Sequence, residues 1–163
     1  MIEQIDHRDL RVAQEIYAVQ QASYAVEQAL IECADFPPLQ VTAADIQQEE
    51  EIFLGYRVDG RLAGVVSFAS SPMLLDIGRM IIHPDFFRRG IARQLLRAVE
   101  TIAGSTKPIT VSTAEKNLPA VQLYLKHGYQ QTERTVLPDG LVLVRFYKPI
   151  KSSETSLADQ AHS

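Results

Sequence analysis

The sequence has few of the features that tie a protein to an oxidising compartment, a membrane or a nucleic acid. One cysteine cannot form an intrachain disulfide, which agrees with a reducing cytoplasm. No apolar run approaches the roughly 18 residues of a membrane span, and the N-terminus lacks the basic start and apolar core of a signal peptide. The 16 basic residues are outnumbered by 20 acidic ones, which argues against a nucleic-acid-binding surface. We therefore expect a cytoplasmic protein without membrane or nucleic-acid partners.

Motifs for several kinds of chemistry are also missing. There is no G-x-S-x-G of a serine hydrolase, no G-x-G-x-x-G and no G-x-x-x-x-G-K-[ST]. The four histidines, at positions 7, 83, 127 and 162, show no metal-ligand spacing, so we expect no bound metal. Cys33 has no base beside it, and a half-buried helix position is the better interpretation than a nucleophile.

The chain has the length and composition of one globular domain. It has 163 residues, of which 46% are hydrophobic and 22% charged. We predict a single domain over residues 1–148. Residues 149–163 are rich in Ser, Glu, Ala and Gln without apolar periodicity, and they predict a frayed tail.

A central stretch, Leu74–Glu100, organises the sequence. Its apolar run up to Ile82 predicts a strand buried on both faces, which Pro84 ends. From Ile91 the apolar residues recur at helical intervals, which predicts an amphipathic helix.

The turn between this strand and this helix is basic. Gly90 allows close approach to the backbone at a helix start, where N–H groups lack partners. Arg88, Arg89 and Arg93 add positive charge, which favours an anion site, whereas the alternative is a solvated basic turn.

The remaining patterns predict the other elements. In order, they are an edge strand at Ile2–Ile5, a helical stretch from about Asp9 to Ala34, a short helix after Thr42, strands at Ile52–Val58 and Leu62–Ser70, a strand at Ile109–Ser112, a helix from about Pro119 to His127, and a hairpin of Gln130–Leu137 with Leu141–Tyr147. The long stretch is long enough for two helices, and Phe36–Leu39 ends it. Thr42 and Asp45 form a capping-box variant, and Asp59-Gly60 is a hairpin turn.

Two stretches resemble signatures of the GCN5-related N-acetyltransferase (GNAT) family. Phe87–Ala92 resembles its acyl-CoA motif, [RQ]-x-x-G-x-[GA], where Gly90 and Ala92 match and Phe87 departs. Asn117–Tyr129 matches the pattern N-x-x-A-x-x-x-Y-x-x-x-G-[FY] completely. The resemblance covers about residues 50–148, and the earlier residues only in the order of their elements.

The resemblance implies both a fold and an activity. The fold is α+β with three layers, in which helices flank a mixed, mostly antiparallel sheet of six to seven strands. In this family the fourth and fifth strands splay apart, and the pantetheine arm of acetyl-CoA pairs with one of them. The implied reaction is direct transfer of the acetyl group to a primary amine, most simply of a small molecule, by a monomer or a homodimer. A non-catalytic acyl-CoA-binding module and a protein or peptide acetyltransferase are the alternatives.

The resemblance also implies site residues. The coenzyme positions are Met80, Ile81, Ile82, Phe87, Arg88, Arg89, Gly90, Ile91, Ala92, Arg93, Asn117 and Tyr124. Tyr124 is implied as the acid that protonates the leaving thiolate. Asp76 is the predicted base. Burying a charged carboxylate in an apolar strand costs free energy, so its presence there favours a functional role. The alternatives are that Asp76 starts the strand in solvent or pairs with Arg79, and that one of Glu49–Glu51 acts as the base through water. For that acidic run, a solvated face is the simpler interpretation.

Overall fold

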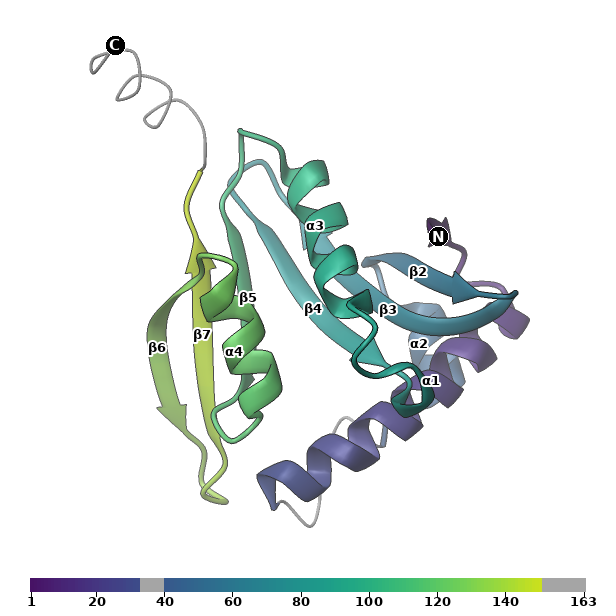
Figure 1. Cartoon of the computed structure of the whole chain (residues 1–163), viewed down its shortest axis with the longest axis horizontal. Coiled ribbons are helices and arrows are strands. Elements are labelled where there is room, and N and C mark those ends of the chain that lie inside the picture. The colour runs from purple at the N-terminus through teal and green to yellow at the C-terminus, as the bar shows by residue number, and fades with distance from the viewer. Residues whose placement is uncertain (33–39, 151–163) are drawn as a thin grey trace.

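The computed structural model describes residues 1–32 and 40–150, which fold around one seven-stranded sheet in the order β1-β2-β3-β4-β5-β7-β6 (Figure 1). Each neighbouring pair is antiparallel except β4 and β5, which run parallel. The strands are β1 (Ile2–Ile5), β2 (Ile52–Val58), β3 (Arg61–Ser70), β4 (Leu75–Ile82), β5 (Ile109–Ala114), β6 (Gln130–Val136) and β7 (Val142–Lys148). The helices are α1 (Leu10–Ile31), α2 (Ala43–Gln48), the 3-10 helix η2 (Pro84–Phe86), α3 (Ile91–Ala103) and α4 (Leu118–Lys126).

Helices cover both faces of the sheet. On one face, α1 and α2 bury Ile16 and Ile46 against Phe53 of β2. On the other face, α3 and α4 contribute Leu95 and Tyr124 to a second core. The three-layer α+β architecture with a mixed, mostly antiparallel sheet is therefore confirmed.

The described part of the first helical stretch is one helix and not two. The Asp9 carboxylate accepts a hydrogen bond from the Arg11 N–H at 2.8 Å and so caps α1. The helix ends where Glu32 adopts a left-handed conformation with φ 56°. The predictions for Cys33, for Phe36–Leu39 and for the tail beyond residue 150 fall outside the described residues.

Two local sequence signals have the structures that they predicted. The Asp45 N–H donates to Thr42 Oγ1 at 3.2 Å, while the Thr42 N–H donates to the Asp45 carboxylate at 2.9 Å, which completes the capping box of α2. Asp59 and Gly60 have φ values of 50° and 79°, and they turn β2 into β3. These contacts join residues near in sequence, which is why the sequence alone predicts them.

β4 has a strand partner on both sides only at its beginning. Its parallel pairing with β5 covers Leu75–Ile77 opposite Ile109–Val111. Beyond that point β5 continues beside β7, so Gly78–Ile82 have no described strand on that side. The β3–β4 ladder also shifts register at Gly78, which marks a bulge. The splay of the fourth and fifth strands is thus present.

The prediction that β4 is buried on both faces is only partly correct. Leu75, Ile77 and Ile81 are buried, whereas Gly78 is exposed and Met80 is half-buried. The physical reason is that β5 leaves after Ile77, so the second half of β4 borders a gap in the sheet. Apolar sequence at such a gap fits a ligand surface as well as it fits a core.

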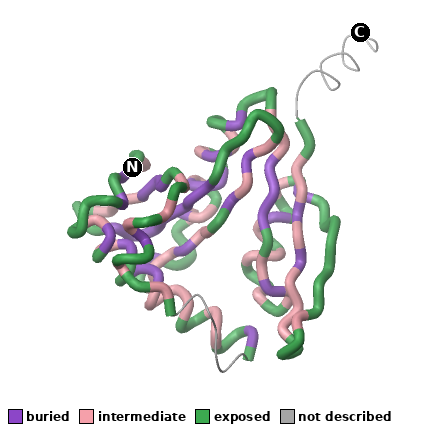
Figure 2. The backbone as a smooth tube through the Cα atoms, turned by 180° about the vertical axis from the view of Figure 1, so that it is seen from behind, coloured by how far each residue is buried: buried purple, intermediate pink, exposed green. Residues whose placement is uncertain are grey.

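The edge of the sheet contrasts with its centre. β3 is buried over seven consecutive residues, while all seven residues of β6 are exposed (Figure 2). The β6 sequence is correspondingly polar. Burial therefore concentrates around β3, β4 and β5, and the last two of these strands border the gap.

Candidate functional site

Backbone groups line the gap beside the second half of β4. The His83 N–H donates to the carbonyl oxygen of Ala63 at 2.8 Å, and Ile82 lies opposite Gly64. Hydrogen-bonded and non-hydrogen-bonded pairs alternate along an antiparallel ladder. The N–H and C=O groups of Met80 and Ile82 therefore point away from β3 and toward the gap. An extended ligand chain can pair with them as a strand would.

The turn after β4 leads to uncapped N–H groups at the start of α3. Arg88 and Gly90 have φ values of 64° and 73°, and Gly90 is an N-cap residue without a side-chain cap. The first N–H groups of α3 are thus available to an external acceptor. A Cβ at Gly90 would lie 3.3 Å from the Arg93 guanidinium. Ile91 is buried and Ala92 half-buried, so they offer backbone to a ligand and not side chains.

Exposed arginines surround this turn. Arg88, Arg89 and Arg93 form no ion pair with a described residue, and the Arg89 guanidinium lies 5.1 Å from the centroid of the Phe86 ring. Phe87, which departs from the family motif, is 43% exposed. The arrangement fits an anion site and also a solvated basic turn, so the coenzyme role of these residues stays a prediction.

The second family signature forms the predicted helix. α4 begins after Asn117, whose Oδ1 accepts a hydrogen bond from the Ala120 N–H at 3.3 Å. Pro119 lies in its first turn, and Gly128, with φ 87°, follows its end. This helix fixes the direction of the Tyr124 side chain.

Tyr124 is buried on the inward side of α4. It is 2% exposed, and its ring centroid lies 5.6 Å from that of Tyr129 and 5.7 Å from that of Phe146. Burial raises the pKa of the Tyr124 hydroxyl, and the nearby Glu27 and Tyr24 raise it further. Tyr124 is therefore protonated at neutral pH and is suited to donate a proton, not to accept one.

Two residues of α1, Tyr24 and Glu27, lie near Tyr124, although neither is among the coenzyme or catalytic residues predicted from the sequence. Burial raises the pKa of Tyr24 to about 12, which the positive charge of Arg79 opposes. Burial also raises the pKa of the Glu27 carboxyl, and a hydrogen bond with the Asn117 side chain opposes that rise.

The sequence did hold a signal for these two residues. Gln20, Tyr24, Glu27 and Ile31 follow one another at steps of four, three and four, so they share one side of α1. Gln20 and Ile31 are buried. Polar residues within a buried helical stripe require partners, and that requirement could have drawn attention to Glu27.

Asp76 lies where β4 and β5 are still paired. Its Oδ1 accepts a hydrogen bond at 2.6 Å from Oγ1 of Thr110, the residue directly opposite on β5. The alternative in which Asp76 pairs with Arg79 is wrong, because Arg79 donates to Gln20 at 2.8 Å and to Glu49 at 3.2 Å. Asp76 thus joins the two strands at the closed end of the gap. Its role as a base stays a prediction.

The interpretation of the acidic run as a solvated face is correct for Glu50 alone, which is exposed. Glu49 forms the ion pair just described. Glu51 accepts a hydrogen bond from Ser67 of β3 at 2.9 Å, and its carboxylate lies against Gly78 at the bulge of β4. The carboxylate of Glu51 therefore lies within reach of the gap.

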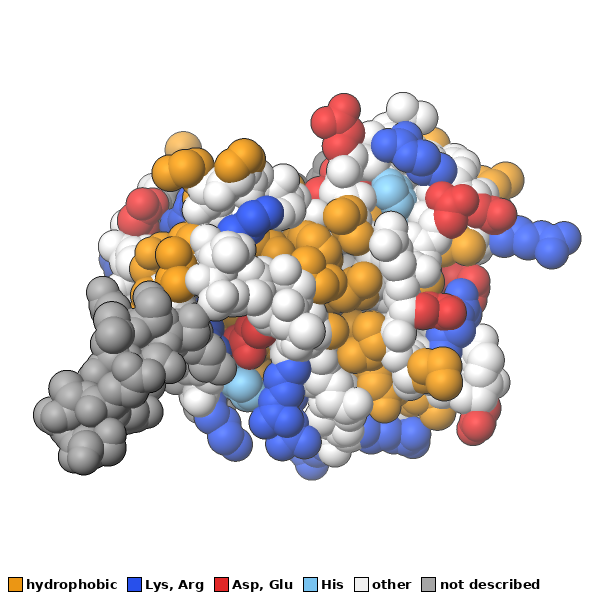
Figure 3. All heavy atoms as spheres, turned by 90° about the horizontal axis from the view of Figure 1, so that it is seen from above, with side chains coloured by type: hydrophobic (Ala, Val, Ile, Leu, Met, Phe, Trp, Pro, Cys, Tyr) orange, Lys and Arg blue, Asp and Glu red, His pale blue; other side chains and the backbone are white. Residues whose placement is uncertain are grey.

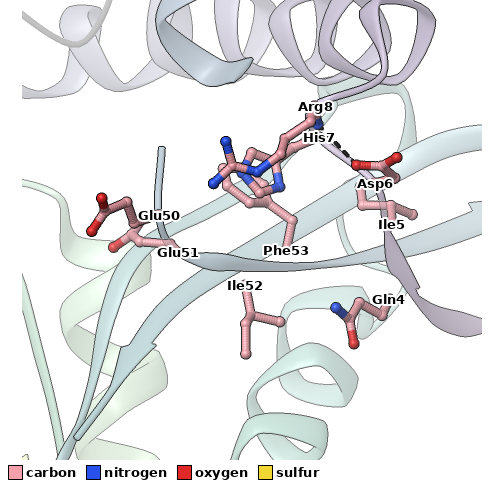
Figure 4. Close-up of a pocket in the computed structure, with 9 residues that line it drawn as sticks. All are labelled: Gln4, Ile5, Asp6, His7, Arg8, Glu50, Glu51, Ile52 and Phe53. Atoms are coloured by element: carbon pink, nitrogen blue, oxygen red, sulfur yellow. Dashed lines mark hydrogen bonds between the residues drawn. The ribbon is translucent and has the colours of Figure 1, made fainter. Parts of the chain in front are cut away.

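A pocket of about 460 Å³ opens beside Glu51 (Figure 4). In it the His7 ring stacks on Phe53 with centroids 4.3 Å apart, and the Arg8 N–H donates to the Asp6 carboxylate at 3.1 Å. The lining residues are Gln4, Ile5, Asp6, His7, Arg8, Glu50, Glu51, Ile52 and Phe53. Three carboxylates against one arginine make this pocket more suitable for a cation than for an anion.

The surface of the molecule indicates a binding site less clearly than the gap and the pocket do. Seen from above, hydrophobic side chains run through the middle of the face and lysines and arginines gather along one edge (Figure 3). Exposed hydrophobic residues such as Met73, Ile102 and Ile150 are ordinary for a folded domain. In residues 1–32 and 40–150, none of the helices has the length and apolar character to cross a bilayer. In the same residues, no cluster of three or more His, Cys, Asp or Glu side chains could hold a metal ion.

The splayed β4–β5 pair and the glycine turn into α3 define an acyl-CoA N-acyltransferase fold. The chain belongs to the GNAT acetyltransferase family, because a family model described as an acetyltransferase (GNAT) domain matches residues 17–149. The family assignment made from the two sequence signatures is thus confirmed.

The chain is also similar to a longer curated protein. UPF0157 protein YqkA of Bacillus subtilis (strain 168) is 42% identical over 147 residues, which are 90% of this chain and 43% of YqkA. This chain therefore spans less than half of that relative's length.

Solved structures of the same fold are more distant in sequence. The ribosomal-protein-S18-alanine N-acetyltransferase of Escherichia coli superposes with a TM-score of 0.72 at 16% identity, over 94% of this chain and 95% of that one. The PaiA N-acetyltransferase of Thermoplasma acidophilum, in complex with coenzyme A, has a TM-score of 0.64 at 16% identity, over 89% and 96%. At such identities the similarity establishes the fold alone.

Proposed function

We propose that this chain is an acetyl-CoA-dependent N-acetyltransferase that transfers the acetyl group directly to a primary amine of a small molecule in a ternary complex. One observation carries the proposal. The backbone groups of Met80 and Ile82 point into a gap of the sheet, and β4 leads through a short turn to the uncapped N-terminus of α3. A ligand with an extended arm and a phosphate end fits this arrangement, and acetyl-CoA has both.

The coenzyme would occupy two parts of the site. Its pantetheine arm would pair with β4, and its pyrophosphate would accept hydrogen bonds from the first N–H groups of α3, where the helix dipole also favours an anion. The proposed coenzyme residues are Met80, Ile81, Ile82, Phe87, Arg88, Arg89, Gly90, Ile91, Ala92, Arg93, Asn117 and Tyr124.

The transfer needs an oxyanion donor and a proton for the leaving group. The amine nitrogen attacks the thioester carbonyl carbon, and a backbone N–H of β4 donates to the oxyanion that forms. The C–S bond then breaks, and the thiolate takes the phenolic proton of Tyr124. Since burial raises the pKa of Tyr124, it is a weak acid for a thiol of pKa about 8.5. We therefore expect assistance from Tyr124 and not an absolute requirement.

The acceptor is proposed to arrive as a cation. Glu49 contacts Arg79 of β4, Glu51 contacts Ser67 of β3, Asp76 is on β4 and Glu27 is on α1. Among the described residues, Arg79 is the one cation that forms an ion pair with any of these carboxylates. Excess negative charge raises the local concentration of ammonium ions. Asp76 is the base proposed from the sequence, and the glutamates are the alternatives.

A binding measurement and an acceptor screen test the proposal together. Calorimetry with acetyl-CoA tests the coenzyme site, and release of free CoA thiol is followed across a panel of small amines and short peptides. Turnover with small amines is the expected result. Turnover with peptides alone would make the chain a protein acetyltransferase, and coenzyme binding without acetyl consumption would make it a binding module.

A further inference from the structure

α1 passes across the open end of the gap between β4 and β5 (Figure 1). Its first half packs on the β3–β4 part of the sheet, where Ile16 shares a core with Ile81. Its last turn reaches the other part, where Ile31 packs with Ala114 of β5. The segment of α1 between these two contacts therefore bridges the two halves of the sheet.

Glu27 lies in this bridging segment, and α4 holds it from the opposite side. The Asn117 side chain accepts a hydrogen bond from the Ala120 N–H through Oδ1, and it lies close enough to the Glu27 carboxylate to lower the pKa of that group. Tyr24 precedes Glu27 by one helical turn. The charge of Glu27 acts on the hydroxyl groups of Tyr24 and Tyr124. A carboxylate, an amide and two phenols from α1 and α4 thus meet beside the gap.

We propose that Glu27 is a catalytic residue, which takes the proton from the acceptor ammonium and later returns it to Tyr124. This inference rests on the proposed N-acetyltransferase function and adds to it the group that activates the amine. It also assigns to Asn117, beside its proposed place at the coenzyme, the role of positioning Glu27.

The protons and electrons balance in this sequence. The Glu27 carboxylate removes one proton from the ammonium, and the freed lone pair of the amine forms the N–C bond to the thioester carbonyl carbon. The C–S bond breaks, and the thiolate takes the phenolic proton of Tyr124. Glu27 then gives its proton to the Tyr124 phenolate. The new amide nitrogen still carries two protons; one of them leaves to water, and the amide keeps the other.

The surroundings of Glu27 suit this work. Burial raises the pKa of its carboxyl, against the opposing hydrogen bond from Asn117, and a base is most effective when its pKa lies near the operating pH. Tyr24 and Tyr124 are neutral at that pH, so neither competes with Glu27 for the amine proton. The charged groups that act on this cluster through Tyr24 are Arg79 of β4 and Glu51.

The other carboxylates near β4 are less suited. Asp76 accepts a short hydrogen bond from Thr110, and Glu51 accepts one from Ser67. Among the described carboxylates, Glu27 is the one whose charge contributes to the raised pKa of Tyr124. Glu27 is therefore the carboxylate that the proposal pairs with Tyr124.

The test compares Glu27→Gln and Glu27→Asp with Glu32→Gln, using the full chain and the best amine from the screen. Glu32 ends the same helix with an exposed side chain and an ion pair to Lys116, so its variant controls for loss of a charge from α1. We expect Glu27→Gln to lower kcat on the order of 10²-fold at neutral pH, while acetyl-CoA affinity and the Glu32→Gln variant stay at wild-type values.

The pH profile distinguishes a base from a structural anchor. Wild-type kcat/KM should fall at low pH as Glu27 becomes protonated, and Glu27→Asp should keep this acid limb with a lower rate. Glu27→Gln should lose the plateau at neutral pH that titration of Glu27 gives. Its rate should instead rise about tenfold per pH unit up to the amine pKa near 10, because solution then supplies the neutral amine. An acid limb in Glu27→Gln that levels off at the same pH as in wild type, or an unchanged kcat, would overturn the proposal.

The result is separable from a failure of the proposed function. If wild-type protein binds acetyl-CoA but acetylates no amine at any pH, the N-acetyltransferase proposal fails, and the Glu27 proposal with it. If wild-type protein turns over and Glu27→Gln does so equally well, Glu27 alone is excluded and the enzyme assignment stands.

Discussion

The two ends of β4 differ in what lies beside them. At Leu75–Ile77 the strand has partners on both sides, and the Asp76–Thr110 hydrogen bond adds a side-chain link to the backbone ladder. At Gly78–Ile82 the ladder to β5 is absent, and α1 bridges the space instead. Across the open end, Ile31 of α1 packs with Ala114 of β5, and Asn117 lies close enough to Glu27 to lower its pKa.

The difference shows how one strand serves both stability and binding. At the closed end the backbone of β4 is paired on both sides, and Asp76 and Thr110 are hydrogen-bonded to each other. Backbone groups at the open end point at no described strand, and unpaired backbone groups favour any ligand that completes the ladder. The bulge at Gly78 separates the paired part of β4 from the part that borders the gap, and bulges are common beside binding sites. The following predictions test each end.

Gly90→Glu should have the largest effect, which is the loss of measurable acetyl-CoA binding. A side chain at φ 73° is strained by about 1–2 kcal/mol, and it would crowd Arg93 and place a carboxylate where the phosphates should lie. Calorimetry with acetyl-CoA measures the loss. Gly60→Glu is the matched control, since Gly60 has φ 79° with open space around it. Gly90→Glu protein that binds acetyl-CoA like wild type would remove the pyrophosphate from this turn.

Tyr124→Phe should lower kcat in the range of 10² to 10⁴-fold, because general acid help is typically worth that much. The ring and its packing stay, so acetyl-CoA affinity and melting temperature should change little. Tyr129→Phe is the control: its ring centroid lies 5.6 Å from that of Tyr124, and its hydroxyl donates to Glu100 at 3.0 Å. That variant should lose about 1 kcal/mol of unfolding free energy with kcat intact. The reverse pattern would make Tyr124 a core residue only.

Thr110→Val and Asp76→Asn test the closed end, with a smaller expected effect. Thr110→Val removes the donor to a charged acceptor and should lower the free energy of unfolding by about 1.5–3 kcal/mol, measured by urea titration. Asp76→Asn keeps an acceptor oxygen and should cost less. Our proposal for Glu27 requires that Asp76→Asn keep the acid limb of the pH–rate profile. Loss of that limb in Asp76→Asn, with Thr110→Val unaffected, would make Asp76 the base, as the sequence suggested.

What the sequence could predict was set by the range of the interactions. The α4 signature, the Thr42–Asp45 capping box and the Asp59-Gly60 turn depend on residues within a few positions of one another, and all three have the predicted structure. The hydrogen bond from Thr110 to Asp76 spans 34 positions, and Asn117 and Glu27, which lie near each other, are about 90 positions apart. No local pattern specifies such pairs. The partner of Asp76 and the position of Glu27 near Tyr124 could therefore be found only from the three-dimensional structure.

Glu27→Gln should have the smallest effect on stability. Whether the variant is more or less stable than wild type shows whether burial of the charge or the contact with Asn117 dominates. Burial raises the pKa of Glu27 in the folded state above its ordinary value of 4.5, so the folded protein holds this proton more tightly than the unfolded chain does. The resulting stabilisation is complete below the unfolded pKa and is lost as the pH rises through the folded pKa. At pH 7 the charged carboxylate therefore disfavours folding.

Glutamine is neutral at every pH and can still accept the hydrogen bond from Asn117 through its Oε1. The Glu27→Gln variant should therefore melt at a higher temperature than wild type at pH 7.5, and the difference should vanish as the pH falls toward 4.5. Differential scanning calorimetry at both pH values measures this, with Glu32→Gln as the exposed control. A variant that is more stable and less active would mark a charge retained for its chemistry. If wild type is instead the more stable protein at pH 7.5, the hydrogen bond to Asn117 outweighs the burial of charge, and Glu27 anchors α1 to α4.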